Sequence, residues 1–256
     1  MSRKIRLIAR LDVKDDFLVK GIQYEGLRKL GDPHDFARRY YEQGIDEILY
    51  LDTVASLYER NNLGNILERT TADVFIPITA GGGLRSAEDV GAVLKAGADK
   101  AAVNTAALRR PELITEVARA FGSQCMVLSI QAKRRDPARP AAGWEAYFDN
   151  GREHSGKDVL EWAKQAVALG AGEILLSSVD REGFQKGMDQ ELIAAVAGLV
   201  DVPVIAAGGA ASAGDIAAAA KGGADAVAVG SILHYGKTDV PALKDEVRAL
   251  GVEGRR

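Results

Sequence analysis

The sequence of 256 residues predicts an α/β fold, a single (β/α)8 barrel made of two similar half-barrels. Eight short apolar runs alternate with amphipathic stretches that carry helix-capping residues. The runs lack strict polar alternation, which is typical of parallel strands covered on both faces. Several segments also recur at an offset of about half the chain. We expect one domain over residues 1–256, with half-barrels at about 1–122 and 123–256, and a doubly wound open sheet is the structural alternative.

The eight expected strands are short runs rich in leucine or β-branched residues, each followed by a capped amphipathic stretch. Eight such units in about 250 residues match the size of a (β/α)8 barrel. The runs are residues 7–13, 47–55, 76–81, 100–105, 125–132, 173–179, 204–208 and 226–231.

Capping residues mark the expected helices. Asp32 and Pro33 form an N-cap with proline at the first helical position, and Gly44 stands where a C-terminal glycine belongs. The segment 86–89, Ser-Ala-Glu-Asp, resembles a capping box. Segments 110–112 and 189–191 are expected to open two more helices, and residues 136–143, with two prolines, to form a surface loop.

The repeat indicates that two four-unit halves close one barrel. Segment 95–99, Lys-Ala-Gly-Ala-Asp, recurs as Lys-Gly-Gly-Ala-Asp at 221–225, which is 126 positions later. A composition bias toward alanine and glycine would not hold one register over this distance. The same offset relates Glu47 to Glu173, Ser86 to Ser212 and Asp89 to Asp215.

Composition and charge exclude several classes of protein. Hydrophobic residues make up 47% and charged residues 27%, which rules out a disordered chain and a fibrous repeat. A net charge of −3 argues against a nucleic-acid partner. The single cysteine excludes an internal disulfide framework, and the three histidines lack ligand spacing, so we expect no metal and no cofactor. No apolar run approaches the ~18 residues of a membrane span, and early charges do not suit a signal peptide, so we expect a cytoplasmic protein without a membrane partner.

Two glycine-rich groups at the carboxyl ends of expected strands are candidate phosphate cradles. The active site of a barrel forms at these ends. Glycine lets backbone N–H groups approach an oxyanion closely, and a following helix start adds positive potential. The glycines could instead serve turn geometry alone, but two groups related by the repeat favour a substrate with a phosphate at each end. The first group is Gly82, Gly83, Asn104 and Thr105, and the second is Gly208, Gly209, Gly230 and Ser231.

Asp12, at the end of the first expected strand, is the candidate acid/base residue, and Lys20 could fix a substrate oxygen or phosphate. The alternative, that Asp12 only caps or salt-bridges its loop, stays open. Arg10 should face the same way and needs a partner, for which we expect Asp12 or Asp52. Asp52 is either part of a polar layer or a substrate ligand. Ser178, at the end of the sixth expected strand, is also assigned to the substrate site.

Nine segments spread over nearly the whole chain form a distinctive set. They are 11–15, Leu-Asp-Val-Lys-Asp; 19–21, Val-Lys-Gly; 31–33, Gly-Asp-Pro; 81–86, Gly-Gly-Gly-Leu-Arg-Ser; 97–100, Gly-Ala-Asp-Lys; 121–125, Phe-Gly-Ser-Gln-Cys; 132–136, Ala-Lys-Arg-Arg-Asp; 170–176, Gly-Ala-Gly-Glu-Ile-Leu-Leu; and 231–234, Ser-Ile-Leu-His. This set resembles the HisF family, the cyclase subunits of imidazole glycerol phosphate synthase. It is less specific for the family's reaction, because chemistry depends on a few side chains.

The resemblance implies a barrel that forms a heterodimer with a HisH-like glutaminase subunit. Ammonia made by that partner would enter at the amino-terminal face and reach a bis-phosphorylated or nucleotide-linked substrate at the other end. Asp99 matches the family's docking position for the glutaminase. A surface ion-pair network is the alternative to this interface. The family's charged gate maps onto Arg6, Glu47, Lys100 and Glu173.

Several positions depart from the family pattern. The two catalytic aspartates fall at Asp12 and at position 131, which is Gln131 here, and an amide cannot exchange a proton at neutral pH. Arg10 stands where the family has cysteine, on the implied ammonia route, Phe184 replaces a threonine, and Ala207 replaces a serine. We expect an ammonia-using synthase subunit with altered chemistry, such as amidation of a nucleotide-linked sugar. The alternatives are an authentic cyclase of histidine biosynthesis that tolerates Gln131, and a non-catalytic, glutaminase-activating ammonia conduit.

Overall fold

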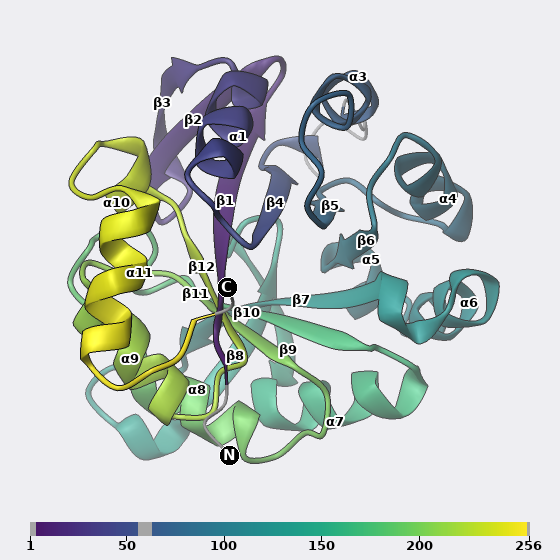
Figure 1. Cartoon of the computed structure of the whole chain (residues 1–256). Helices are drawn as coiled ribbons and strands as arrows, with labels where there is room; N and C mark the ends of the chain where they lie inside the picture. The colour runs from purple at the N-terminus through teal and green to yellow at the C-terminus, as the bar shows by residue number, and fades with distance from the viewer. Residues whose placement is uncertain (1–3, 56–62, 255–256) are drawn as a thin grey trace.

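A computed structural model describes residues 4–55 and 63–254. Eight parallel strands close into a barrel, because each pairs with the next and the last pairs with the first. Figure 1 shows the helices arranged around this barrel. In order around the barrel the strands are β1 (Arg6–Lys14), β4 (Glu47–Asp52), β5 (Ile78–Gly81), β6 (Lys100–Val103), β7 (Met126–Arg134), β10 (Glu173–Ser178), β11 (Val204–Ala207) and β12 (Ala226–Val229).

The predicted (β/α)8 barrel is confirmed, and each of the eight predicted runs overlaps one of these strands. Several predicted runs extend beyond the carboxyl end of the observed strand. Residues 53–55, for example, follow β4 as a turn, because the backbone N–H groups of Val54 and Ala55 bond the Asp52 side chain instead of a neighbouring strand. The polar ends of the runs therefore belong to the loops that surround the barrel mouth.

The predicted caps form where the sequence places them. Asp32, Ser86 and Asp189 each accept a backbone N–H at a helix start, and the reciprocal capping box is formed at Ser212. The described α-helices are α1 (Pro33–Glu42), α3 (Leu63–Thr70), α4 (Ala87–Lys95), α5 (Thr105–Arg109), α6 (Glu112–Phe121), α7 (Val159–Leu169), α8 (Gln190–Ala197), α9 (Ala213–Lys221), α10 (Ser231–His234) and α11 (Val240–Ala249), with the 3-10 turns η1 (Ser123–Cys125) and η2 (Pro140–Ala142). None of the described helices is long and apolar enough to cross a membrane.

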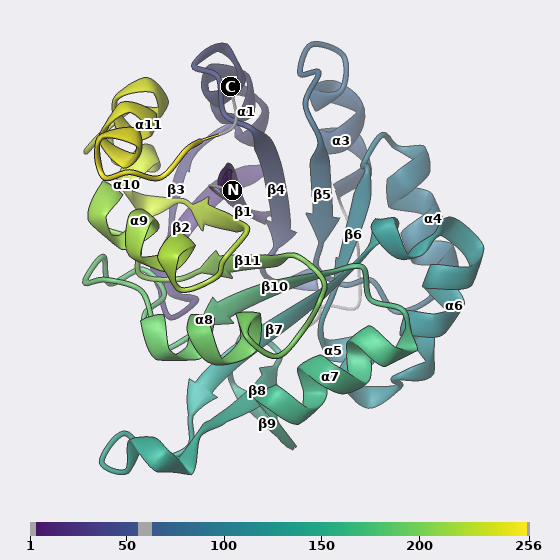
Figure 2. The ribbon, with the colours of Figure 1, turned by 60° about the horizontal axis from the view of Figure 1, so that its bottom comes forward.

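Two antiparallel hairpins extend the barrel at its carboxyl-terminal mouth, and the sequence analysis did not predict them. The first pairs β2 (Phe17–Ile22) with β3 (Glu25–Gly31) and joins β1, and the second pairs β8 (Trp144–Phe148) with β9 (Glu153–Asp158) and joins β7. β3 and β9 contain no buried residue, so neither produces an apolar run. Figure 2 shows the ends of β7 and β8 reaching beyond the barrel, with the predicted surface loop 136–143 between them.

Residues that the sequence repeat relates make equivalent hydrogen bonds in the structure. The Asp99 carboxylate accepts the N–H of Ile78 at 2.8 Å, and 126 positions later Asp225 accepts the N–H of Val204 at 3.0 Å. Each pair fastens the start of one strand to the start of the next. Inside the barrel, a separate apolar cluster lies between the two ends of the strands, formed by Ile8, Leu49, Ala102, Val127, Leu175, Ile205, Ala207, Ala226 and Ala228.

Candidate active site

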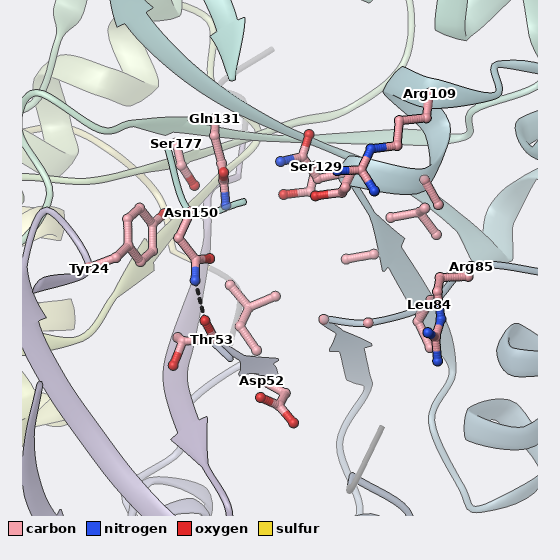
Figure 3. A pocket seen from close by; sticks show the side chains of 18 of the residues that line it. Tyr24, Asp52, Thr53, Leu84, Arg85, Arg109, Ser129, Gln131, Asn150 and Ser177 are labelled. Carbon is pink, nitrogen blue, oxygen red and sulfur yellow. Dashed lines mark hydrogen bonds between the residues drawn. The ribbon is translucent and has the colours of Figure 1, made fainter. Parts of the chain in front are cut away.

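A cavity of about 280 Å³, which we call the large cavity, lies at the carboxyl ends of the barrel strands. In Figure 3, Tyr24, Gln131, Asn150 and Ser177 gather on one side of it, and Arg85 and Arg109 on the other. Asn150, in the turn between β8 and β9, donates from its amide to the backbone oxygen of Thr53. The two hairpins therefore contribute Tyr24 and Asn150 to the wall of the cavity.

The first glycine group lines this cavity, together with Asp52. Gly82 has φ +103°, and a Cβ built on it would lie 2.2 Å from the backbone oxygen of Asp52, so no other residue fits there. The Asp52 carboxylate accepts the N–H groups of Val54 at 3.0 Å and Ala55 at 2.9 Å. Asp52 thus shapes the turn after β4 and also faces the cavity. Gly83, Asn104 and Thr105 are the other members of the group that line the cavity.

Sequence reasoning missed the arginines around this group. Arg85, Arg109 and Arg110 all line the cavity. The Arg109 guanidinium lies 3.1 Å from the Asp149 carboxylate and is largely exposed. Segment 110–112, Arg-Pro-Glu, follows the first glycine group closely, and the sequence analysis interpreted it only as a helix start. Arg109 pairs with Asp149 and Arg110 pairs with Glu116. Guanidinium groups are suited to contact a phosphate, so this end of the cavity is the candidate anion site.

Asp12 belongs to a buried group of four charges, which we call the mouth cluster. Arg10 donates to Asp12 at 2.8 Å and to Glu182 at 2.9 Å, and Lys20 bridges the same two carboxylates at 2.7 and 2.5 Å. The expected Arg10 to Asp12 pair is confirmed, whereas Glu182 was not anticipated. Each side chain is at most 5% exposed. The mouth cluster comprises Arg10, Asp12, Lys20 and Glu182.

The mouth cluster is ionised and electrically balanced. Burial by itself would raise the pKa of Asp12, but the charges of Arg10 and Lys20 outweigh it and hold the pKa below its usual range. The pKa of Glu182 is lowered against burial in the same way. Burial would lower the pKa of Lys20, and the two carboxylates raise it instead. Asp12 is therefore a carboxylate at neutral pH, and it does not line either described cavity.

Gln131 lies on the opposite wall of the barrel, in β7, the fifth barrel strand counted from β1. Its side-chain oxygen accepts the N–H of Gly151 at 2.9 Å, in the turn of the second hairpin. Gln131 also lines the large cavity. The glutamine thus fastens a mouth loop, and it offers the substrate an amide in place of a carboxylic acid.

The second glycine group lines a much smaller cavity of about 20 Å³. Gly209 has φ +91°, and a Cβ on it would lie 2.3 Å from the backbone oxygen of Gly187. Ser178 is buried, lies outside the lining of both cavities, and has a hydroxyl without a hydrogen-bond partner among the described residues. Lys20 lines this smaller cavity rather than the large one, as do Gly208, Gly209, Gly230 and Ser231.

His234 packs against Gly230 of the second glycine group. Its Nε2 lies 2.9 Å from the Arg10 backbone oxygen and its Nδ1 lies 2.7 Å from the Tyr40 hydroxyl. Burial lowers the pKa of His234 to about 4, so the ring is neutral, with Nε2–H donating to Arg10 and Nδ1 accepting from Tyr40. Across the described ranges 4–55 and 63–254, no three His, Cys, Asp or Glu side chains come together as a metal-binding group.

Four charges form an alternating ring at the amino-terminal end of the barrel, which we call the gate ring. Arg6 contacts Glu47 at 2.7 Å and Glu173 at 2.6 Å, and Lys100 contacts the same carboxylates at 3.3 and 2.7 Å. The two cations are 15% and 19% exposed and the two carboxylates 3% and 6%. Asp99, which precedes Lys100 in the chain, is exposed, and its carboxylate accepts the backbone N–H of Ile78. The gate ring comprises Arg6, Glu47, Lys100 and Glu173.

Comparison with known proteins gives the same family over the length of the chain. A family model described as histidine biosynthesis protein matches residues 6–239. The imidazole glycerol phosphate synthase subunit HisF of Legionella pneumophila is 56% identical over 205 residues, which cover 80% of this chain and 95% of the relative. The HisF subunit of Mycobacteroides abscessus is 47% identical over the whole of both chains, and that of Myxococcus xanthus is 49% identical over 98% of this chain and 97% of the relative. The chain therefore belongs to the histidine biosynthesis protein family, as a member of its HisF group.

Proposed function

We propose that this protein is the synthase subunit of an ammonia-using complex. A HisH-like glutaminase partner supplies ammonia at the gate ring, and the ammonia reaches a phosphorylated acceptor in the large cavity. The observation that carries the proposal is the placement of a ring of four charges at one end of the barrel and an arginine-lined cavity at the other. The apolar cluster between them suits a neutral molecule such as ammonia better than ammonium, since a charge there would lose its hydration.

The chemistry at the mouth differs from the imidazole-forming reaction named for the relatives. In the HisF family one carboxylate assists ammonia attack and a second assists ring closure by proton transfer. Here Asp12 is an ionised carboxylate and Gln131 is an amide. We assign Asp12 as the acceptor of the proton that ammonia releases when its nitrogen bonds to the acceptor carbon and the group it replaces there departs with the bonding electron pair. Without a second acid, the reaction we favour stops at amidation, for example of a nucleotide-linked sugar.

Two alternatives each have an observation in their favour. Identity of 47% to the Mycobacteroides abscessus HisF over both whole chains favours an authentic cyclase that tolerates Gln131. The enclosure of Asp12 by Arg10 and Lys20 favours a non-catalytic conduit that activates the glutaminase. One assay distinguishes the authentic cyclase from our proposal. The isolated chain is supplied with ammonium salt and the cyclase substrate, phosphoribulosyl-formimino aminoimidazole carboxamide ribonucleotide. Formation of imidazole glycerol phosphate, identified by mass spectrometry, would establish the cyclase and contradict our proposal.

The ammonia route is tested with Lys100→Ala at the gate ring. Because the variant changes the entrance and not the mouth, synthesis from glutamine through the glutaminase is expected to fall at least five-fold, and synthesis from ammonium salt to stay within two-fold. Lys95→Ala, on an exposed position of α4, is the matched control. Equal losses from both ammonia sources would show that Lys100 does not act at the entrance. Glutaminase stimulation without a product from any acceptor would favour the conduit.

A further inference from the structure

The two hairpins at the mouth follow the same repeat as the barrel strands. β2 ends at Ile22 and β8 at Phe148, which is 126 positions later, and the same offset relates Tyr24 to Asn150 in the turns that follow. Both of these side chains line the large cavity, although their hairpins join β1 and β7 on opposite walls of the barrel. Each half-barrel therefore brings one polar side chain to the same cavity.

Tyr24 and Asn150 both have a left-handed backbone conformation. φ is +63° at Tyr24 and +61° at Asn150, and the preceding residues, Gln23 and Asp149, each have φ +50°. Asparagine tolerates this conformation, whereas a bulky side chain such as tyrosine is rare there and strains the backbone. Two-residue hairpin turns usually carry asparagine, aspartate or glycine at these positions. A tyrosine held in a strained turn beside a cavity is thus a candidate for a role in that cavity.

Contacts with the mouth cluster and a neighbouring loop hold Tyr24 in place. The Arg10 guanidinium lies 5.3 Å from the centre of the Tyr24 ring, within the range of a cation–π contact. The backbone N–H of Gln23 donates to the Glu182 carbonyl oxygen at 3.0 Å, which fixes the turn to the loop between β10 and α8. Burial raises the pKa of the Tyr24 hydroxyl, and the charge of Arg10 opposes this only in part. The hydroxyl therefore keeps its proton at neutral pH and can donate it in a hydrogen bond.

Asn150 supplies a second uncharged donor. Its side-chain nitrogen donates one hydrogen to the Thr53 backbone oxygen. An amide nitrogen carries two hydrogens, so the other can be donated into the cavity. Four uncharged side chains gather on this side of the cavity in Figure 3: Tyr24, Gln131, Asn150 and Ser177. They offer hydrogen bonds to a ligand oxygen without a carboxylate among them to repel negative charge on it.

We propose that Tyr24 and Asn150 form an oxyanion site, in which the tyrosine hydroxyl and the asparagine amide donate hydrogen bonds to the oxygen of an acceptor carbonyl group. The inference rests on the proposed function, which supplies the ammonia and the role of Asp12, and it narrows the acceptor to a molecule with a carbonyl carbon. Because the two donors are held in place before the reaction, they act most strongly on charge that develops in the transition state.

The electrons and protons of this step balance. When the nitrogen of ammonia bonds to the carbonyl carbon, the π electron pair of the C=O bond moves to the oxygen, where Tyr24 and Asn150 stabilise it. Asp12 takes the proton that the nitrogen releases. The electron pair on the oxygen then forms the C=O bond again, and the replaced group departs with its own bonding pair.

Binding of a ketone probe tests the inference without turnover. The probe is phosphoribulosyl-formimino aminoimidazole carboxamide ribonucleotide, labelled with 13C at the ketone carbon of its ribulosyl unit and added to the full chain without ammonium. Donated hydrogen bonds withdraw electrons from a carbonyl carbon, so its 13C resonance is expected to move downfield on binding. This shift is expected to decrease in Tyr24→Phe, which removes only the hydroxyl, and in Asn150→Gly, which suits the left-handed backbone.

Two matched controls make the same changes outside the described lining of the large cavity. Tyr235→Phe removes a hydroxyl from an exposed tyrosine, and Gln23→Gly places glycine at the other left-handed position of the first turn. Both are expected to leave the 13C shift unchanged. No binding of the probe, an unchanged shift in either Tyr24→Phe or Asn150→Gly, or an equal decrease in the controls would overturn the inference.

The rate of ammonia addition is the second readout. With ammonium salt present, consumption of the probe per folded chain is expected to fall about 100-fold in Tyr24→Phe, as for the loss of one oxyanion donor, and an unchanged rate would overturn the inference. If the wild-type chain binds the probe without consuming it, the 13C shift decides alone. Formation of imidazole glycerol phosphate that slows in Tyr24→Phe would contradict the proposed function and leave the inference standing. An unchanged 13C shift in both variants of a chain that delivers ammonia to another acceptor would do the reverse.

Discussion

Each end of the barrel contains two cationic side chains and two carboxylates, but the two groups differ in solvent exposure. In the gate ring the cations are 15% and 19% exposed, whereas no side chain of the mouth cluster exceeds 5%. The gate ring follows the repeat, since Glu47 and Glu173 lie 126 positions apart. The mouth cluster breaks it, because Lys20 comes from a hairpin and Glu182 from a loop. Partly hydrated cations can rearrange at a lower free-energy cost than the fully buried charges of the mouth cluster.

The largest expected effect comes from breaking the mouth cluster. Glu182→Ala removes one carboxylate and leaves Arg10 with Asp12 alone, so we expect a loss of about 3–5 kcal/mol in the free energy of unfolding. Lys100→Ala in the gate ring is expected to lose less, about 1–3 kcal/mol, because its ammonium is partly hydrated and the buried carboxylates of Glu47 and Glu173 keep Arg6 as a partner. Urea unfolding of both variants measures the difference. Similar losses would mean that burial does not distinguish the two groups of charges.

The next largest expected effect is the loss of synthetic activity when the Asp12 carboxylate is removed. Asp12→Asn keeps the shape of the side chain but cannot take the proton from ammonia, so ammonium-dependent synthesis is expected to fall at least about 100-fold. Circular dichroism checks that the variant folds, and activity is taken per folded chain. Unchanged turnover would remove Asp12 from the reaction and leave it only a structural role in the mouth cluster.

A pH effect on stability is expected from His234 at the mouth of the barrel. His234 has a pKa of about 4 in the folded protein and about 6.5 when unfolded, so the unfolded chain binds more protons between these values. Stability is therefore complete above about pH 6.5 and falls as the pH drops toward 4, by about 3 kcal/mol in all. His234→Gln should flatten this part of the urea-unfolding curve. His154→Gln, at a largely exposed histidine, serves as the control, and a slope that persists in His234→Gln would refute the assignment.

The smallest expected effect concerns Gln131. Gln131→Leu leaves the Gly151 N–H without its partner and is expected to cost about 1 kcal/mol of stability. Gln131→Glu keeps an acceptor and is expected to cost less. Hydrogen exchange at the Gly151 amide reports the contact directly. Equal protection in both variants would show that Gln131 does not fasten the second hairpin.

Local sequence patterns were sufficient to predict the barrel, its helix caps and the location of the first glycine group. Each depends on local information: apolar runs for strands, residues such as Asp32 and Ser212 for helix starts, and the 126-residue repeat for closure. The pair of Arg10 and Asp12 was predictable for the same reason, because the residues are two positions apart on one strand.

The arrangement of side chains at the mouth of the barrel depends on contacts between residues that are distant in the sequence. Glu182 meets Arg10 and Lys20 from 172 and 162 positions away, and nothing local marks it as their partner. The outer strands of the two hairpins, β3 and β9, contain no buried residue and leave no apolar run. The first hairpin nevertheless fastens the loop that carries Glu182, and the two hairpins bring Tyr24 and Asn150 to the large cavity. Sequence periodicity reports which face of an element is buried, whereas the space left between distant loops depends on how they pack.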